Sequence, residues 1–468
     1  MTNFLSKSKP NILVLDAIMG NGKTQRIKQI ILDSKQPVIY ITPLLEEAHT
    51  VVGAIVDDKG RHVKDDSGYY MYDNEHILAS KCFMLPSNRN NNGSKLEHIK
   101  YLILNNHNIA STHQLFSILD QDVISLLQMN NYMLVVDEAL NVWHNLNIYE
   151  GLVDGVKTNK QLVEDEKQER GSGSMTDREV QNLIKNGVIE VDPLGLLHWQ
   201  SDKFEVDEGL FLSRVKRLCD LKQLYLSNGR VVFWELNSVV LNCFSNIVIG
   251  TYMFEHNFMS HYLDVHGFEY KVEKFGNKPS FYKDLINIEQ GKLNLIGEKD
   301  YSLSYNDLCM KKHSENHPKD VLRKNLDNFL KNKCKSKSGE RIWTCFKKVT
   351  PTISNQRYTN DWVAYNIKAT NEYRHIEHVA YLCNNFPNTF LVAMVTKRNS
   401  REFNGDLWAL QEMLQYVWRS RIRGNEDVKS LEDRKINLYI PSKRMRNLLE
   451  QWLNDEFEGE KNEEINKY

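Results

Sequence analysis

Short continuous apolar runs, each followed by a more polar segment, recur through the first half of the chain. They are typical of buried strands, because a strand that is covered on both faces carries no polar alternation. The runs lie at residues 12–15, 37–41, 132–136, 224–226, 231–234 and 247–249. Residues 25–32 follow the first run with the pattern of a helix, so this half is predicted to be an α/β sheet with helices between its strands.

The second half has the same character after a polar, turn-containing connection. Its longest predicted helix covers residues 406–423, where apolar side chains recur at helical spacing at Leu407, Leu410, Leu414 and Val417. Other helices are predicted at residues 321–330, 375–385 and 444–452, and strands at 341–346, 390–394 and 436–440. The sequence therefore predicts two successive α/β halves.

A charged stretch, about residues 145–210, interrupts the first half and is mostly helical in pattern. Within it, residues 188–199 have the pattern of a small hairpin around Asp192 and Pro193. We therefore predict an α-rich insertion in the first domain. The predicted boundaries are residues 1–272 for the first domain, 273–319 for a connection and 320–468 for the second domain.

Composition adds limits on partners and location. The chain has 468 residues, of which 41% are hydrophobic and 26% charged, and its formal net charge is -1. This charge excludes a uniformly basic nucleic-acid coat, although a basic channel between domains would still be compatible with it. No apolar run reaches transmembrane length and the first ten residues lack a signal-peptide core, so we expect a cytoplasmic protein with no membrane partner. The seven cysteines form no Cys-x-x-Cys pair, so no structural zinc is expected.

The stretch Ala-Ile-Met-Gly-Asn-Gly-Lys-Thr at residues 17–24 ends the first strand and begins the first helix. A strand, a glycine-containing loop and a helix bind phosphate, because the loop N–H groups and the helix dipole both attract anions. Lys23 would reach the β- and γ-phosphates, and the Thr24 hydroxyl would hold Mg²⁺. The predicted nucleotide-binding residues of this loop are Gly20, Asn21, Gly22, Lys23 and Thr24. The alternative is a glycine turn with a solvated lysine.

An acidic pair, Asp137 and Glu138, comes directly after the apolar run at residues 132–136. A strand end in an α/β sheet places such carboxylates beside the phosphate loop. Asp137 is therefore a candidate Mg²⁺ ligand, and Glu138 is a candidate to polarise an attacking water. Acidic pairs at strand ends also serve as helix caps, but the combination with Lys23 and Thr24 favours the catalytic interpretation.

The predicted helix at residues 406–423 carries a polar stripe opposite its leucines. Four-residue steps place Gln411, Gln415, Arg419 and Arg423 on this stripe, while Arg421 points elsewhere on an ideal helix. A stripe of Gln and Arg that faces away from the core can bind an anion, and an arginine finger is one use for it. The alternative is an ordinary solvated helix face.

Taken in order, these motifs resemble those of superfamily 2 helicases, and most of all divergent examples encoded by bacteriophages. Residues 17–24 resemble motif I, Asp137-Glu138-Ala139-Leu140 resembles motif II, the DEAD/DEAH box, and residues 415–423 resemble motif VI. Less specific matches are Thr42-Pro43 to motif Ia, Ser111-Thr112-His113 to the next nucleic-acid motif, Gly250-Thr251-Tyr252 to motif III and Ala369-Thr370-Asn371 to motif V.

The sequence departs from the family pattern in two ways within motif VI. Trp418 takes the place of the usual Gly, and the final arginine is one place later than the common spacing. The arginine finger is therefore left open between Arg421 and Arg423. An adenine-reading glutamine motif is not evident before residue 17, so ATP as the nucleotide follows from the resemblance alone.

The resemblance implies an α/β protein of two tandem RecA-like domains, with ATP and Mg²⁺ in the cleft between them. The first domain would supply Lys23, Thr24, Asp137 and Glu138, and the second would supply Gln415, Arg419 and Arg421 or Arg423. Nucleic-acid contacts, mostly to the backbone, are expected at Thr42, Pro43, Thr112, His113, Thr251, Thr370 and Asn371.

The implied function is an ATP-dependent DNA helicase or translocase that acts on single-stranded or forked nucleic acid in phage DNA replication or recombination. DNA is favoured over RNA, replication or recombination proteins are the expected partners, and the location would be the host cytoplasm. The alternatives are an RNA helicase and a nucleic-acid-stimulated ATPase that does not separate strands. A P-loop nucleotide kinase is less favoured, because it needs one α/β domain with a lid and no second half. The intact Lys23, Asp137 and Glu138 also argue against a non-hydrolysing scaffold.

Overall fold

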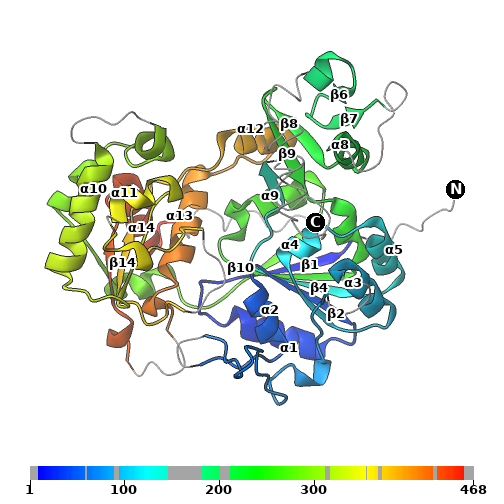
Figure 1. Ribbon diagram of the computed structural model, residues 1–468, viewed down its shortest axis with the longest axis horizontal. Coiled ribbons are helices and arrows are strands. Elements are labelled where there is room, and N and C mark those ends of the chain that lie inside the picture. The colour runs from blue at the N-terminus through cyan, green and yellow to red at the C-terminus, as the bar shows by residue number, and fades with distance from the viewer. Residues whose placement is uncertain are drawn as a thin grey trace.

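The computed structural model describes residues 9–57, 61–88, 94–145, 182–200, 211–310, 317–354, 356–366, 372–424 and 430–457. These residues form two α/β halves, each built on its own parallel sheet (Figure 1). The first half runs from blue to green in Figure 1, and the second runs from yellow-green to red. The predicted α/β class with two successive sheets is therefore confirmed.

Six strands form the sheet of the first half: β1 Asn11–Asp16, β2 Val38–Thr42, β3 Ile109–Thr112, β4 Met133–Asp137, β10 Asn246–Thr251 and β11 Tyr270–Lys274. They are parallel and lie in the order β11-β1-β10-β4-β2-β3. The strand before the phosphate loop and the strand before the acidic pair are thus separated only by β10. Since the strands are parallel, their carboxyl ends meet at one edge of the sheet, where α/β proteins bind ligands.

Both faces of this sheet are covered, which explains the continuous apolar runs. Leu15 and Val135 face one hydrophobic cluster, to which α1 Lys23–Asp33 and α2 Leu45–Val51 contribute. Val14 and Val136 face the other. The helices on that second face are α3 Lys95–Leu104, α4 His113–Ser117, α5 Gln121–Met129 and α9 Phe258–Val265.

The described part of the insertion and its neighbourhood consists mainly of strands. β5 Trp143–Asn145, β9 Val231–Glu235 and β8 Leu224–Ser227 form an antiparallel sheet, and β6 Ile189–Val191 pairs with β7 Leu197–Trp199 in the predicted hairpin. The helix α8 Phe211–Asp220 precedes β8. Within the predicted insertion, about residues 145–210, the structure describes only residue 145 and residues 182–200, which contain a helical turn at residues 182–185 and the predicted hairpin. The α-rich character predicted for the rest falls on residues 146–181 and 201–210, which lie outside the described residues. Asp192 forms the hairpin turn, because its carboxylate accepts the N–H groups of Leu194 at 2.8 Å and Leu196 at 2.9 Å.

The sheet of the second half has four parallel strands in the order β12-β15-β14-β13: Ile286–Ile288, Ile436–Tyr439, His378–Tyr381 and Arg341–Thr344 respectively. Its core also includes α10 Pro318–Asp327, α11 Thr350–Ser354, α13 Gly405–Val417 and α14 Lys443–Leu453. The strands predicted at 341–346 and 436–440 are confirmed. The second sheet begins earlier than expected, because β12 lies inside the predicted connection 273–319. This strand of three residues carries a central Asn287 and so leaves no apolar run in the sequence.

Two predictions in the second half are wrong. Residues 375–385, predicted as a helix, contain the strand β14, which is buried between β13 and β15. Residues 390–394, predicted as a strand, belong to the helix α12 Thr389–Arg398. Asn388 caps this helix by accepting the N–H groups of Phe390 and Leu391 at 3.0 and 3.2 Å. A short apolar run does not by itself distinguish a helix from a buried strand.

The helix α12 belongs to the second half in sequence but packs on the first half, where Figure 1 shows it in orange beside β8. Leu391, Met394 and Val395 enter the large hydrophobic cluster of the first half. The Ser227 hydroxyl also donates a hydrogen bond to the Phe390 carbonyl at 2.6 Å. The two halves are therefore joined on this side by a packed helix.

A buried ion pair between Arg398 of α12 and Glu235 of β9 reinforces this junction. Both side chains are at most 5% exposed, and Trp143 Nε1 and His266 Nε2 also contact the Glu235 carboxylate. Burial alone would raise the pKa of Glu235, but the hydrogen bonds from His266 and Arg398 outweigh it and hold that pKa below its ordinary value. The Arg398 guanidinium also lies 3.8 Å from the centre of the Tyr225 ring.

We expect Arg398→Ala to lower the free energy of unfolding by about 3–5 kcal/mol, because it leaves a buried carboxylate without its cation. Denaturant unfolding followed by circular dichroism measures this loss. The matched control is Arg61→Ala, whose partner Asp57 lies at the surface, and it should change the unfolding midpoint little. Equal effects of the two substitutions would contradict a stabilising role for the Arg398–Glu235 pair.

Candidate nucleotide site at the junction of the two halves

The phosphate loop bends at two glycines with left-handed backbone. Gly20 has a φ of +89° and Gly22 a φ of +85°, which L side chains rarely adopt. Gly22 is the N-cap of α1, which has no side-chain cap and no acidic residue in its first turn, so the helix start retains the N–H groups and dipole that bind an anion. A Cβ at Gly22 would meet nothing within 4 Å, whereas one at Gly20 would lie 2.7 Å from the Arg423 carbonyl oxygen. The loop is thus open at Gly22 and contacts the second half at Gly20.

Lys23 lies inside this loop, with only 8% of its surface exposed, and its Nζ donates a hydrogen bond to the Ala17 carbonyl. Burial lowers the pKa of Lys23. The carboxylates of Glu138 and Asp137 oppose this shift, while Arg423 adds to it. The amine predicted to bind phosphate therefore sits among the acidic pair and an arginine of the second half.

Asp137 ends β4 and is held by Tyr40, whose hydroxyl donates to Oδ2 at 2.9 Å. Burial and the neighbouring Glu138 raise the pKa of Asp137 to about 6, while the Tyr40 hydrogen bond acts in the opposite direction. The carboxylate is therefore mostly charged at neutral pH, as a Mg²⁺ ligand must be.

Glu138 follows with a left-handed backbone, at a φ of 64°. Such strain in a residue other than glycine is uncommon and concentrates at functional sites. Its N–H donates to the Gly250 carbonyl of β10 at 2.8 Å, and its Oε2 accepts a hydrogen bond from Gln415 Nε2 at 3.3 Å. The carboxylate predicted to polarise water is thus positioned by both halves.

The polar stripe of α13 faces the first half. Gln411 donates through Nε2 to the Tyr252 carbonyl at 2.8 Å, and Gln415 contacts Glu138 as described. Gln411 and Gln415 are 2% and 7% exposed, whereas Leu410 and Leu414 pack in the core of the second half. The alternative of a solvated helix face is therefore wrong for these glutamines.

The helix predicted over residues 406–423 ends earlier, at Val417, and a 3₁₀ turn follows at Arg421–Arg423. Trp418 packs edge-on against the rings of Tyr282 and Trp452, with centroids 5.1 and 5.3 Å apart. The chain then turns toward β14, where the Arg421 N–H donates to the Ile376 carbonyl at 3.1 Å. Long-range packing, which the helical periodicity does not reveal, therefore ends the helix.

Three arginines of the second half, Arg419, Arg423 and Arg374, lie near one another at this site. Arg419 is 3% exposed, and burial, together with Arg423, lowers its pKa to about 10, while Glu138 opposes the shift. Burial, Arg423 and Arg419 likewise lower the pKa of Arg374 to about 10. Because these guanidinium groups repel one another in a partly dry site, an anion bound among them would be stabilised.

Arg421 points away from this group. Its Nη1 pairs with Glu377 at 2.9 Å and its Nε donates to the Lys435 carbonyl at 2.5 Å, both within the second half. The structure therefore brings Arg419 and Arg423, but not Arg421, beside the acidic pair.

Sequence reasoning missed Glu47, Arg374 and Tyr40. Burial and the neighbouring Asp137 raise the pKa of Glu47 well above its ordinary value, while Arg419 opposes the shift. Glu47 lies shortly after the predicted motif Ia, which could have drawn attention to it. Tyr40 lies two residues before the same motif, and Arg374 follows the predicted motif V by three residues.

The oxygen ligands at this site suit Mg²⁺ bound together with a nucleotide. Mg²⁺ in such sites is held by one or two protein oxygens plus the phosphates, and the Thr24 hydroxyl and Asp137 carboxylate are oxygens of this kind. No group of three or more His, Cys, Asp and Glu side chains that could hold a metal ion occurs among the described residues. Together with the open glycine at residue 22, this ligand set fits a magnesium–nucleotide complex.

Two of the threonines predicted to contact nucleic acid have hydrogen-bond partners within the protein, and the hydroxyl of the third, Thr251, is buried without a partner among the described residues. Thr42 and Thr251 are fully buried, and the Thr42 hydroxyl donates to the Leu44 carbonyl at 2.7 Å. The Thr112 hydroxyl caps α4. This placement does not favour nucleic-acid contacts by the three hydroxyls. The other predicted contacts in motif V, Thr370 and Asn371, lie outside the described residues.

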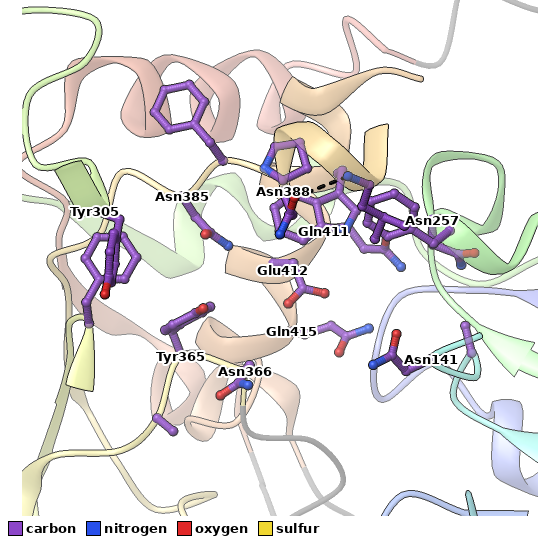
Figure 2. Close-up of a pocket in the computed structure, with 18 of the residues that line it drawn as sticks. Asn141, Asn257, Tyr305, Tyr365, Asn366, Asn385, Asn388, Gln411, Glu412 and Gln415 are labelled. Atoms are coloured by element: carbon purple, nitrogen blue, oxygen red, sulfur yellow. Dashed lines mark hydrogen bonds between the residues drawn. The ribbon is translucent and has the colours of Figure 1, made fainter. Parts of the chain in front are cut away.

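A cleft of ≈ 1600 Å³ lies between the halves, next to the acidic pair. Pro43 and His113, both predicted nucleic-acid contacts, line it from the first half. Figure 2 shows Gln411, Glu412 and Gln415 entering it from α13. Because Gln415 also contacts Glu138, one side chain joins the cleft to the candidate site of hydrolysis.

Comparison with known proteins finds one relative over nearly the whole chain. Residues 280–453 match a protein-family model described as "YonV C-terminal Rossmann-like domain". The chain is also 29% identical over 466 residues to the "SPbeta prophage-derived uncharacterized protein YonV" of Bacillus subtilis (strain 168), which covers 95% of this chain and 99% of that protein. The aligned region therefore spans both halves described above.

Several solved structures are similar along almost the whole chain, at low identity. One titled "XPD_APO" is 12% identical, covers 95% of both chains and has a TM-score of 0.49. "XPD_Helicase" is 14% identical, covers 96% of this chain and 91% of its own, and has a TM-score of 0.39. "Structure of S. tokodaii Xpd4" is 12% identical, covers 95% of this chain and 94% of its own, and has a TM-score of 0.43. Likenesses this distant carry no conclusion about activity.

In the described ranges, no helix combines the length and the apolar character needed to span a bilayer.

Proposed function

We propose that this protein is an ATP-dependent DNA helicase or translocase, which couples ATP hydrolysis to movement along nucleic acid. One observation carries the proposal: Lys23 and the acidic pair Asp137–Glu138 of the first half converge with Arg419 and Arg423 of the second half. Hydrolysis of a γ-phosphate uses groups of these kinds to hold phosphates, bind Mg²⁺, orient water and stabilise charge. A site completed by two halves also links hydrolysis to their relative motion.

Each side chain has a proposed role. Lys23 and the loop N–H groups would bind the β- and γ-phosphates, and Thr24 and Asp137 would hold Mg²⁺, which neutralises phosphate charge when bound. Glu138, positioned by Gln415, would orient the attacking water and accept its proton. Arg419 and Arg423 would then stabilise the charge that develops on the transferred phosphoryl group.

We assign residues up to the end of β11 at Lys274 to the first domain, and we assign residues 280–453, which include β12 and match the family model, to the second domain. ATP would draw the two domains together, because its phosphates contact side chains of both. Loss of the γ-phosphate would remove these contacts and allow the domains to separate. A strand in the cleft beside Gln415 would then be gripped in alternation and moved.

DNA is the proposed substrate, and phage replication or recombination the proposed setting, because the full-length relative is described as prophage-derived. An RNA helicase, or an ATPase that does not separate strands, would use the same nucleotide site. A nucleotide kinase is disfavoured by Arg419 and Arg423, which reach the acidic pair from the segment after α13 in the second half.

The test is ATP-dependent displacement of a labelled strand from forked DNA and from forked RNA of the same sequence. The proposal expects displacement from DNA that requires ATP and Mg²⁺. Displacement from RNA alone would favour the RNA helicase, and nucleic-acid-stimulated hydrolysis without displacement would favour the simpler ATPase. Phosphate transfer to a nucleoside monophosphate, unaffected by nucleic acid, would favour the kinase.

We expect Glu138→Gln to bind ATP normally but to hydrolyse it about 10²–10⁴-fold more slowly, because an amide cannot accept the proton of water. Single-turnover hydrolysis measures the chemical step separately from nucleotide binding. Glu47→Gln is the matched variant, since Glu47 is a second carboxyl group near the arginines. If Glu47→Gln lowered the single-turnover rate more than Glu138→Gln did, Glu47 and not Glu138 would be the general base.

The acidic limb of the pH–rate profile should reflect the protonation of the Asp137 carboxylate. Hydrolysis that depends on Mg²⁺ should fall as the pH falls through about 6, because protonated Asp137 cannot bind the cation. Tyr40→Phe removes a hydrogen bond that stabilises the carboxylate, so it should raise the pKa of Asp137 and move this limb to higher pH. Profiles of kcat/KM at limiting Mg²⁺ measure the shift, and an unchanged limb in Tyr40→Phe would refute the assignment.

A further inference from the structure

The cleft between the halves is lined mainly by aromatic rings and side-chain amides. Phe346 is 6% exposed and supports two more accessible rings, Tyr305 at 5.4 Å and Tyr365 at 5.9 Å between centroids, both edge-on. Figure 2 shows Tyr305 and Tyr365 on one side of the cleft and Asn141 and Asn257 on the other. The rings therefore have fixed positions on one wall, as stacking on planar ligands requires.

Three amides of the same lining carry an unsatisfied hydrogen-bonding atom. Asn257 Nδ2, Asn385 Nδ2 and Gln411 Oε1 have no hydrogen-bond partner among the residues that the structure describes. All three side chains are at least nine-tenths buried. A buried donor or acceptor without a partner is costly, so a ligand that offers both acceptors and donors would be favoured here.

Among the residues that the structure describes, few charged side chains line the cleft. They are Lys347 and Lys348, which are both exposed, and Glu412, which projects from α13 toward the middle of the cleft. A channel that tracks a phosphate backbone is strongly basic along its length, and this lining is not.

We propose that the cleft holds single-stranded nucleic acid with its bases turned inward, stacked on Tyr305 and Tyr365 and hydrogen-bonded to the amides. The phosphates then lie outward, toward Lys347 and Lys348. This inference rests on the proposed function and specifies how the substrate binds, namely as an unpaired strand held by its bases. The family resemblance, in contrast, implies contacts mostly to the nucleic-acid backbone. Duplex fits poorly, because its bases already stack on one another and pair through their edges.

The test uses the full-length protein and two oligonucleotides of equal length, one of deoxythymidine and one with abasic sites throughout. Fluorescence anisotropy gives the affinity of each at constant salt. The inference expects the abasic strand to bind more weakly, and Tyr305→Ala and Tyr365→Ala each to weaken binding of the thymidine strand roughly 5- to 100-fold. Binding of the abasic strand should change little in either variant. The control variant is Tyr101→Ala, an exposed tyrosine of α3 outside the cleft, which should leave both affinities unchanged.

Equal affinity for the two strands would overturn the inference without any variant, and so would unchanged thymidine binding in both tyrosine variants. In either case, ATP hydrolysis that is still stimulated by both strands would leave the proposed function standing, with backbone contacts in place of bases. Failure of the proposed function is a separate result, namely hydrolysis that neither strand stimulates.

Discussion

The Lys23→Ala protein should bind nucleotide weakly and lose ATP hydrolysis, by at least roughly 10²–10³-fold. Lys23 is the one lysine of the phosphate loop, and its amine lies among Glu138, Asp137 and Arg423. Removing it deletes the positive charge on the β- and γ-phosphates and leaves the acidic pair facing them.

The loss in Lys23→Ala is measured as steady-state phosphate release at saturating single-stranded DNA, with nucleotide affinity measured separately. Lys35→Ala, an exposed lysine shortly after α1, is the matched control and should behave as wild type. If a folded Lys23→Ala protein hydrolysed ATP at the wild-type rate, the assignment of the nucleotide site to this loop would be contradicted.

Arg419→Ala and Arg423→Ala should each reduce turnover strongly, because an arginine finger contributes roughly 10³–10⁵ in rate. Arg419 is buried beside Glu138, and Arg423 contacts the phosphate loop through its backbone at Gly20. Substrate affinity should change less than kcat, since the charge that these groups stabilise develops in the transition state.

Arg421→Ala is the matched control for both arginine variants. It removes an arginine from the same turn, but that arginine pairs with Glu377 and the Lys435 carbonyl, away from the acidic pair. Its turnover should stay near wild type, with a modest loss of stability, and each variant is checked for folding by circular dichroism. A large loss of turnover confined to Arg421→Ala would show that Arg421 is the finger.

The local parts of the site could be predicted from the sequence. The phosphate loop depends on a strand, two glycines, Lys23 and the start of a helix, all within one short stretch. The acidic pair follows an apolar run, and parallel strands bring both motifs to one edge of the sheet. Spacing along the chain is enough for such features, because the neighbouring backbone determines their geometry.

Features that depend on distant packing could not be predicted. The end of α13 at Val417 depends on the contacts of Trp418 with Tyr282 and Trp452, which are far away in sequence. The helix α12 has the composition of a buried strand. Only its Asn388 cap and its packing against the first half distinguish it from a strand. Arg374 and Glu47 lie close to weakly matching motifs but not within them, and only the fold brings their side chains to the site.

The positions of the side chains in the fold also change the interpretation of the less specific motifs. Hydroxyl residues at strand ends were predicted to bind phosphates, but Thr42 and Thr251 are buried. The cleft beside them offers rings and amides instead. A sequence motif can therefore mark the location of a binding site while the contacts come from other side chains.

The most direct test of the central claim is the saturating ATPase rate of the wild-type protein, measured with and without single-stranded DNA. If one hydrolytic site is completed by both halves and responds to a strand in the cleft, DNA should raise this rate strongly. Neither Lys23→Ala nor Arg419→Ala should then recover the rate at any DNA concentration. The claim would be contradicted by a wild-type rate that is the same with and without DNA, or by DNA-stimulated hydrolysis that persists in Lys23→Ala.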